Sequence, residues 1–187
     1  MVEECRITLG TPQLTSVEMS CEEYINGFNR RAEFEPMCKA CPNWASRWGC
    51  PPLDEDVVQN LRRYDKVRLF CLSAPVTHWP QEAGVDEMTA AMQALRPSYE
   101  RELLDFESAV GGAAALFTGK CYHCGALSCS RLEGKPCRHA GVVRPSLEAW
   151  GFDLGKTATE VFGRALEWYS AAGSKPRYLT LIGAVFY

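Results

Sequence analysis

The sequence predicts a single α/β (or α+β) domain, residues 1–187, with helices packed on a small mixed sheet and two cysteine-rich metal-binding loops. Three observations predict this fold class. The chain is 47% hydrophobic with a net charge of −3, which is typical of one globular domain with a real core. Residues 67–73 and 178–186 are almost continuously apolar, as buried strands are. Segments with helical periodicity lie between such strands, which favours helices packed on a sheet.

The expected elements of the N-terminal third are short. Residues 5–9 suit an edge strand. Residues 16–28 place apolar side chains between acidic ones and predict a helix that Gly27 ends. A second helix is expected after residue 52, because the three acids at 54–56 suit a first helical turn. Its buried side would consist of Leu53, Val57, Val58 and Leu61.

The middle of the chain predicts a strand–helix–strand path. Residues 67–73 suit a central strand, residues 86–110 a long helix broken or kinked at Pro97, and residues 113–118 another strand. Such a path returns the chain parallel to its start on the same side of the sheet. We therefore expect the segments that flank this path to lie side by side.

The C-terminal part predicts two helical elements and a strand. A short helical turn at 145–150 should stop at Gly151. A capping box from Thr157 to Glu160 is expected to open a further helix. Residues 178–186 suit a terminal strand.

Cysteine is the informative excess in the composition. The chain has ten cysteines, and seven of them fall within residues 38–50 and 121–137. The first residues, 1–5, are acidic and polar and lack the features of a secretion signal, so we expect a cytoplasmic protein. Clustered cytoplasmic cysteines hold a metal or do redox chemistry more often than they form disulfides. The acidic balance and the lack of a long apolar run argue against nucleic-acid and membrane partners.

The second cysteine segment reads C-x2-C-x4-C-x7-C. Four thiolates are the ligand set of both a closed zinc site and an iron–sulfur cluster. Structural zinc sites prefer two separated C-x2-C pairs, and only the first pair has this form here. The spacing therefore favours a 4Fe-4S cluster, with zinc as the alternative. The candidate ligands are Cys121, Cys124, Cys129 and Cys137.

The first cysteine segment, C-x2-C-x8-C-P-P, offers only Cys38, Cys41 and Cys50. Its prolines and glycine predict a wrapped loop without regular structure. A site with three thiolates needs a fourth ligand or leaves one position open, and an open iron could polarise a substrate. Candidates for the fourth ligand are Cys71, Cys21, His123, His139 or a small molecule. In the middle of a strand, Cys71 is more simply explained as a small buried hydrophobe.

Basic and aromatic residues accompany both cysteine segments. Cations near an anionic cluster offset its charge, and tryptophans could shield it from water. The alternative is that arginines lie on loops because loops are hydrated. The residues concerned are Arg47, Lys120, Arg131, Lys135, Arg138, Arg144, Trp44 and Trp48.

The order of these motifs resembles a known family. The elements are Cys38-x2-Cys41 with Trp44, Trp48-x-Cys50-Pro-Pro, Gly119-x-Cys121-x2-Cys124, Gly134-x-Pro-Cys137-Arg and the segment from Arg144 to Asp153. Together they resemble a prokaryotic family of predicted metal-binding proteins that is common in anaerobic bacteria and archaea. The resemblance implies two cysteine-rich metal loops with iron–sulfur clusters, and no established reaction. The segment from Arg144 then suggests a helix start whose amides and guanidinium could face a cluster or an anion.

Three functions are compatible with these observations. The first is an iron–sulfur protein of anaerobic metabolism with two 4Fe-4S clusters, which transfers electrons to a redox partner protein or supports it. The second is an enzyme whose three-cysteine cluster has an open iron. The third is a zinc-stabilised binding module in which metal only folds the loops.

Overall fold

A five-stranded sheet forms the centre of the computed structural model, which describes residues 6–52, 57–125, 127–169 and 174–187. The strand order is β1-β3-β5-β4, and β2 also pairs with β3. The strands are β1 (Thr8–Leu9), β2 (Gln13–Ser20), β3 (Lys66–His78), β4 (Ala114–Leu116) and β5 (Tyr178–Phe186). The helices are α1 (Cys21–Phe28), α2 (Arg31–Ala40), α3 (Val57–Leu61), α4 (Val85–Val110) and α5 (Leu154–Glu160). Two 3-10 turns, η1 (Ser130–Glu133) and η2 (Glu148–Trp150), complete the described elements.

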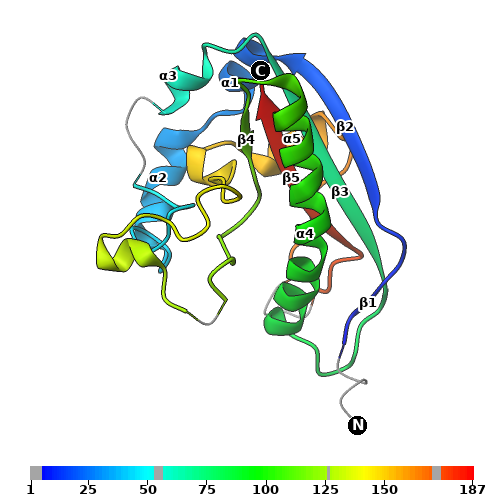
Figure 1. The fold of residues 1–187 in the computed structure, drawn as a ribbon. Coiled ribbons are helices and arrows are strands. Elements are labelled where there is room, and N and C mark those ends of the chain that lie inside the picture. Colours follow the sequence, from blue (N-terminus) through cyan, green and yellow to red (C-terminus); the bar gives the residue numbers. More distant parts are fainter. Residues whose placement is uncertain (1–5, 53–56, 126, 170–173) are drawn as a thin grey trace.

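Helices cover both faces of the sheet (Figure 1). Side chains of a strand alternate between the two faces, so β3 contributes to two apolar clusters. Leu69 of β3 packs in the cluster that contains Tyr24 of α1 and Phe152. Phe70 packs on the other face with Tyr99 of α4. The central position that the apolar run 67–73 predicts for this strand is confirmed, because β3 lies between β2 and β5.

The predicted fold class is confirmed, with one difference in strand direction. Every pair of named strands is antiparallel, whereas we expected a mixture. β3 and β4 nevertheless run in the same direction, as the strand–helix–strand path predicts, because each is antiparallel to β5. The C-terminal strand, β5, lies between β3 and β4 and pairs with both of them.

The N-terminal elements differ from the predictions at their boundaries. Most of the helix expected over 16–28 is correct, but the chain stays in β2 until Ser20 and α1 begins at Cys21. The backbone N–H of Glu23 donates to Oγ of Ser20, which caps the helix. Gly27 lies inside α1 and does not end it. Cys5, Leu53 and the predicted acidic turn at 54–56 lie outside the described residues.

The later helices differ from the predictions. The break that was the first alternative at Pro97 does not occur, because α4 continues through this residue and packs on the sheet. The last helix begins at Leu154, because Asp153 is its N-cap and accepts a 2.8 Å hydrogen bond from the N–H of Lys156. Thr157 is therefore inside α5, where its hydroxyl donates to the carbonyl oxygen of Asp153. The expected short turn before Gly151 is confirmed as η2.

Candidate metal centre

The two cysteine segments, residues 38–50 and 121–137, lie against one another on one side of the molecule (Figure 1). A Cβ atom at Gly49 would lie only 3.3 Å from Cβ of Cys121. Arg47 Nη1 donates a 3.1 Å hydrogen bond to the carbonyl oxygen of Cys121, and Trp48 Nε1 donates to that of Lys135 at 3.2 Å. The prediction that the two segments lie side by side is confirmed.

Arg131 fastens the second segment to the backbone of the first. Its guanidinium donates to the carbonyl oxygens of Arg47 at 2.7 Å, Cys50 at 2.6 Å and Pro52 at 3.0 Å. It also lies 5.4 Å from the ring centre of Trp48. The charge of Arg131 acts on the Cys50 thiol as well, where it partly opposes the rise in pKa. A residue predicted as a counter-charge therefore also holds the two segments together.

The first segment is more regular than expected. Cys38 lies in the last turn of α2, and Cys41 caps that helix; turns then lead to Cys50. The backbone and side-chain amides of Asn43 each lie 3.5 Å from Sγ of Cys41 and donate to it. Burial and the nearby Cys41 thiol raise the pKa of Cys38. Burial and the thiols of Cys41 and Cys121 raise the pKa of Cys50, so the thiols of both segments interact.

The second segment has the same kind of environment. Burial raises the pKa of Cys121, with further contributions from the thiols of Cys137 and Cys124. The N–H of His139 donates to Sγ of Cys137 at 3.4 Å. Arg138 approaches Sγ of Cys124 at 4.0 Å.

Cys129 is the N-cap of η1 and is partly buried. The same Arg138 donates to the carbonyl oxygen of the preceding residue, Ser128, at 2.7 Å. One side chain thus connects the Cys124 thiol with the backbone next to Cys129. The structure places all four predicted ligands of this segment in one loop region.

A cavity of about 160 Å³ opens beside the three cysteines of the first segment. Its wall includes Cys38, Cys41 and Cys50, together with residues from other parts of the chain. They include Gly119, Lys120, Ser146 and Glu148, and Trp44 of the first segment itself also lines the cavity. The structure thus brings the three predicted ligands to one cavity and adds a carboxylate to it.

Two of the candidates for a fourth ligand lie elsewhere. Cys71 lines a different cavity, with Thr15 and Arg164, and burial raises its pKa to about 11. Sγ of Cys21 donates to the carbonyl oxygen of Leu61 at 3.2 Å, and burial raises its pKa to about 11 as well. Both thiols are protonated core groups, as the simpler explanation for Cys71 predicts.

The two histidine candidates lie beside a polar network on α4. Nε2 of His123 is 3.3 Å from a carboxylate oxygen of Glu100, and its ring is 5.9 Å from that of His139. Arg96 pairs with the same Glu100 at 2.7 Å and lies over the ring of Tyr122. The sequence predictions did not include this network, although an arginine and a glutamate four residues apart in a helix are a signal for such an ion pair.

Arg144 does not face the cysteines as the family resemblance suggested. Its guanidinium binds both carboxylate oxygens of Glu107, with hydrogen bonds of 2.6 to 3.1 Å. The N–H of Ala115 donates to the same carboxylate at 2.8 Å. Arg144 therefore joins its own loop to α4 and β4.

Glu148 is the residue of the site that sequence reasoning missed. Its carboxylate accepts hydrogen bonds from the N–H of Gly119 at 3.2 and 3.3 Å. Burial raises its pKa, although hydrogen bonds to the carboxylate oppose this rise. Glu148 lies in the segment from Arg144 to Asp153, which carries part of the family resemblance. This resemblance was the sequence signal that could have identified Glu148 as a site residue.

Within the described ranges, no group of three or more His, Cys, Asp or Glu side chains already has the arrangement of a metal site. No helix in the same ranges has the length and apolar character needed to cross a membrane. A family model described as "predicted metal-binding protein (DUF2284)" matches residues 27–185. Neither the curated proteins nor the solved structures gave a match.

Proposed function

Because the chain belongs to the family of predicted metal-binding proteins, we propose that its cysteine segments bind two 4Fe-4S clusters. The protein would transfer electrons to a cytoplasmic redox partner or support that partner in anaerobic metabolism. One cluster would be held by Cys121, Cys124, Cys129 and Cys137. The other would be held by Cys38, Cys41 and Cys50 with one further ligand.

The donor chemistry of the described residues fits such clusters. Cysteine thiolates are the ligands of iron–sulfur centres, and hydrogen bonds to sulfur tune the potential of the centre. N–H groups of Asn43 and His139 donate to ligand sulfurs, one in each segment. The raised pKa values mean that the free thiols of Cys50 and Cys121 keep their protons, so metal binding would release them.

The observation that carries the proposal is the contact between the two cysteine segments. Cys50 follows Gly49, whose Cβ position is 3.3 Å from that of Cys121. Since neighbouring Cα atoms are about 3.8 Å apart, the two cysteines lie close enough for electrons to pass between clusters that they hold. A zinc module whose metals only fold separate loops would gain nothing from this proximity.

Purification without oxygen tests this proposal. We expect a brown protein with broad visible absorption that bleaches on reduction, and with comparable amounts of iron and acid-labile sulfide. The variants Cys41→Ser and Cys124→Ser should each remove about half of the iron, because the two cysteines would serve different clusters. A colourless protein with stoichiometric zinc would instead establish the zinc-stabilised module.

The cavity beside the first segment favours a second candidate function. Three cysteines meet there with Glu148 and Lys120, and neither Cys21 nor Cys71 reaches it. A metal held by three thiolates at this point would keep a position for an exogenous molecule, which is the basis of an enzyme with an open iron. Cyanide added to the reduced protein should then change the electron paramagnetic resonance signal of one cluster, and Cys41→Ser should abolish this change.

A further inference from the structure

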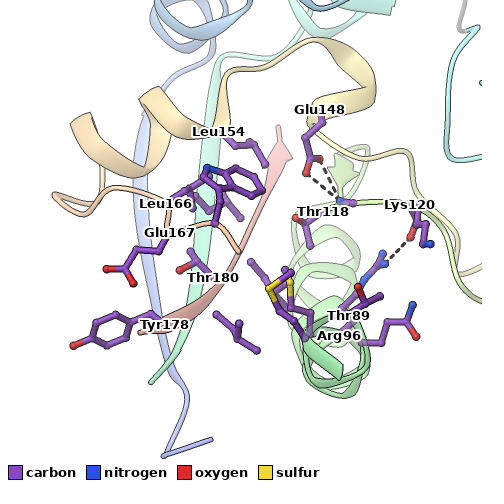
Figure 2. Close-up of a pocket in the computed structure, with 18 residues that line it drawn as sticks. Thr89, Arg96, Thr118, Lys120, Glu148, Leu154, Leu166, Glu167, Tyr178 and Thr180 are labelled. Atoms are coloured by element: carbon purple, nitrogen blue, oxygen red, sulfur yellow. Dashed lines mark hydrogen bonds between the residues drawn. The ribbon is translucent and has the colours of Figure 1, made fainter. Parts of the chain in front are cut away.

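A second cavity, of about 240 Å³, lies between the first half of α4 and strand β5 (Figure 2). An engineered protein cavity of about 150 Å³ is large enough to bind benzene. This cavity can therefore hold a small organic molecule of somewhat greater size. It is larger than the cavity beside the first cysteine segment, which Glu148 also borders.

The cavity follows from the shortness of β4. The three residues of β4 pair only with residues 184–186 of β5. Over residues 178–182 the same edge of β5 has no partner among the named strands of the described chain. α4 and the segment around Leu166 close over this open edge and leave the space between them.

The walls of the cavity are mainly apolar. Small-molecule sites in proteins combine an apolar lining with a few polar groups that orient the ligand. Here α4 contributes two methionines, and leucines come from β5 and from the segments around residues 154 and 166. These side chains are Met88, Met92, Leu154, Leu166, Leu179 and Leu181.

Among the described residues, two carboxylates line the cavity. Glu167 is paired with Arg177, so Glu148, which lies at one end (Figure 2), is the carboxylate that can orient a ligand. Its carboxylate accepts from the N–H of Gly119 and forms no ion pair with any residue that the structure describes.

Arg96, a buried cation that also lines the cavity, is already bound to Glu100 and to the carbonyl oxygen of Lys120 at 2.6 Å. Glu148 is half-buried, and the charge of Arg96 acts on it without forming an ion pair. A half-buried carboxylate with no ion-pair partner of its own favours a ligand that brings one.

We propose that this cavity binds a small molecule with an apolar body and a primary amine, and that the ammonium group hydrogen-bonds to Glu148. Glu148, Gly119 and Lys120 also line the cavity of the first cysteine segment. The amine end of the ligand would therefore lie next to the three cysteines. Only this last placement, beside the three cysteines, rests on the proposed metal function. There, a primary amine would be the class of substrate that the open metal position takes.

Three six-carbon probes that differ only in their polar group test the proposal. We would titrate hexylamine, hexanol and hexanoate into the protein purified without oxygen and measure heat. We expect hexylamine to bind most tightly and hexanoate most weakly. Glu148→Gln keeps an oxygen for Gly119 and removes the charge, so it should weaken hexylamine binding by at least about tenfold and change hexanol little. Tightest binding by hexanoate, which would point to Lys120, overturns the proposal, as does equal binding of all three.

A pair of tryptophan variants on α4 keeps the test independent of Glu148. Thr89 lines the cavity, whereas Ala94 on the same helix is exposed and does not. Thr89→Trp should fill the space and abolish hexylamine binding, while Ala94→Trp should leave it unchanged. Unchanged binding in Thr89→Trp overturns the proposal.

Iron counts on the same samples separate the two proposals. Amine binding to a protein without iron would support this cavity as an amine site and refute the iron–sulfur clusters. An iron-containing protein that binds no amine would do the reverse.

Discussion

The carbonyl oxygen of Cys50 accepts a 2.6 Å hydrogen bond from Nη1 of Arg131, which lies 81 positions later in the chain. The same nitrogen also donates to the carbonyl oxygen of Arg47. The first cysteine segment therefore depends on the second for part of its backbone hydrogen bonding. We expect the two segments to keep or lose their conformation together, and with it their capacity to hold metal.

Replacing Arg131 by methionine tests this dependence. Hydrogen bonds from a charged donor contribute more than neutral ones, so the loss should lower the free energy of unfolding by about 2 kcal/mol. Iron should also pass faster to a chelator from both cysteine segments. Arg131→Lys should not restore the wild-type behaviour, because an ammonium group cannot reproduce the planar fork that reaches three carbonyls. Arg101, exposed on α4, provides the control variant Arg101→Met, which should behave like the wild type.

Cys71→Ala should leave the metal content unchanged. Cys71 lies in β3 and lines a cavity with Arg164, apart from the cavity of the three cysteines. Removing one buried sulfur should lower the free energy of unfolding by about 1 kcal/mol. Urea denaturation and an iron count measure the two quantities. A loss of about half of the iron would contradict the structure and make Cys71 a ligand.

Glu18 should make stability depend on acidity. Hydrogen bonds from Lys66, Tyr187 and Arg68 lower the pKa of Glu18 from 4.5 to about 2, so the unfolded chain binds its proton more readily than the folded one. Its contribution is therefore complete above pH 4.5 and is lost as the pH falls toward 2.

Glu18→Gln is the variant that measures this contribution. The difference in unfolding free energy between wild type and Glu18→Gln should be largest near neutral pH and should shrink in acid. Using the difference removes effects that both proteins share, such as loss of metal in acid. If the difference in unfolding free energy stays constant from neutral pH to pH 3, the hydrogen bonds to the Glu18 carboxylate do not form in solution.

Gly183 should tolerate no side chain. A Cβ atom there would lie 2.7 Å from both Leu103 Cδ2 and the carbonyl oxygen of Leu116, and 2.9 Å from the hydroxyl of Tyr99. Gly183→Ala should therefore lower the free energy of unfolding by about 1–3 kcal/mol or more, since the surrounding core must shift. Gly27→Ala is the matched control: nothing lies within 4 Å of that Cβ position, and alanine favours a helix. Equal stability of the two variants would contradict the packing around β5.

Parts of the fold with a strong local signal were predictable. The apolar runs gave β3 and β5 because strands buried on both faces need continuous apolar sequence. Residues 16–20 of β2 fall within the predicted helix instead, because the side chains of this strand are nearly all exposed and neither face carries a buried pattern. The start of α5 was misplaced because two residues, Asp153 and Thr157, are both acceptable caps, and only the packed structure selects Asp153.

By itself, the sequence determined which residues are candidate metal ligands, because seven cysteines in two short segments are visible without any fold. The tertiary structure decided how these segments meet. β5, the last strand, separates β3 from β4, and Arg131 reaches across to the first segment. It also decided that Arg144 binds Glu107 and that Glu148 borders both the cavity at β5 and the cavity of the first cysteine segment. The physical reason is that ligand chemistry resides in single side chains, whereas strand order, ion pairing and cavities depend on contacts between residues distant in the chain.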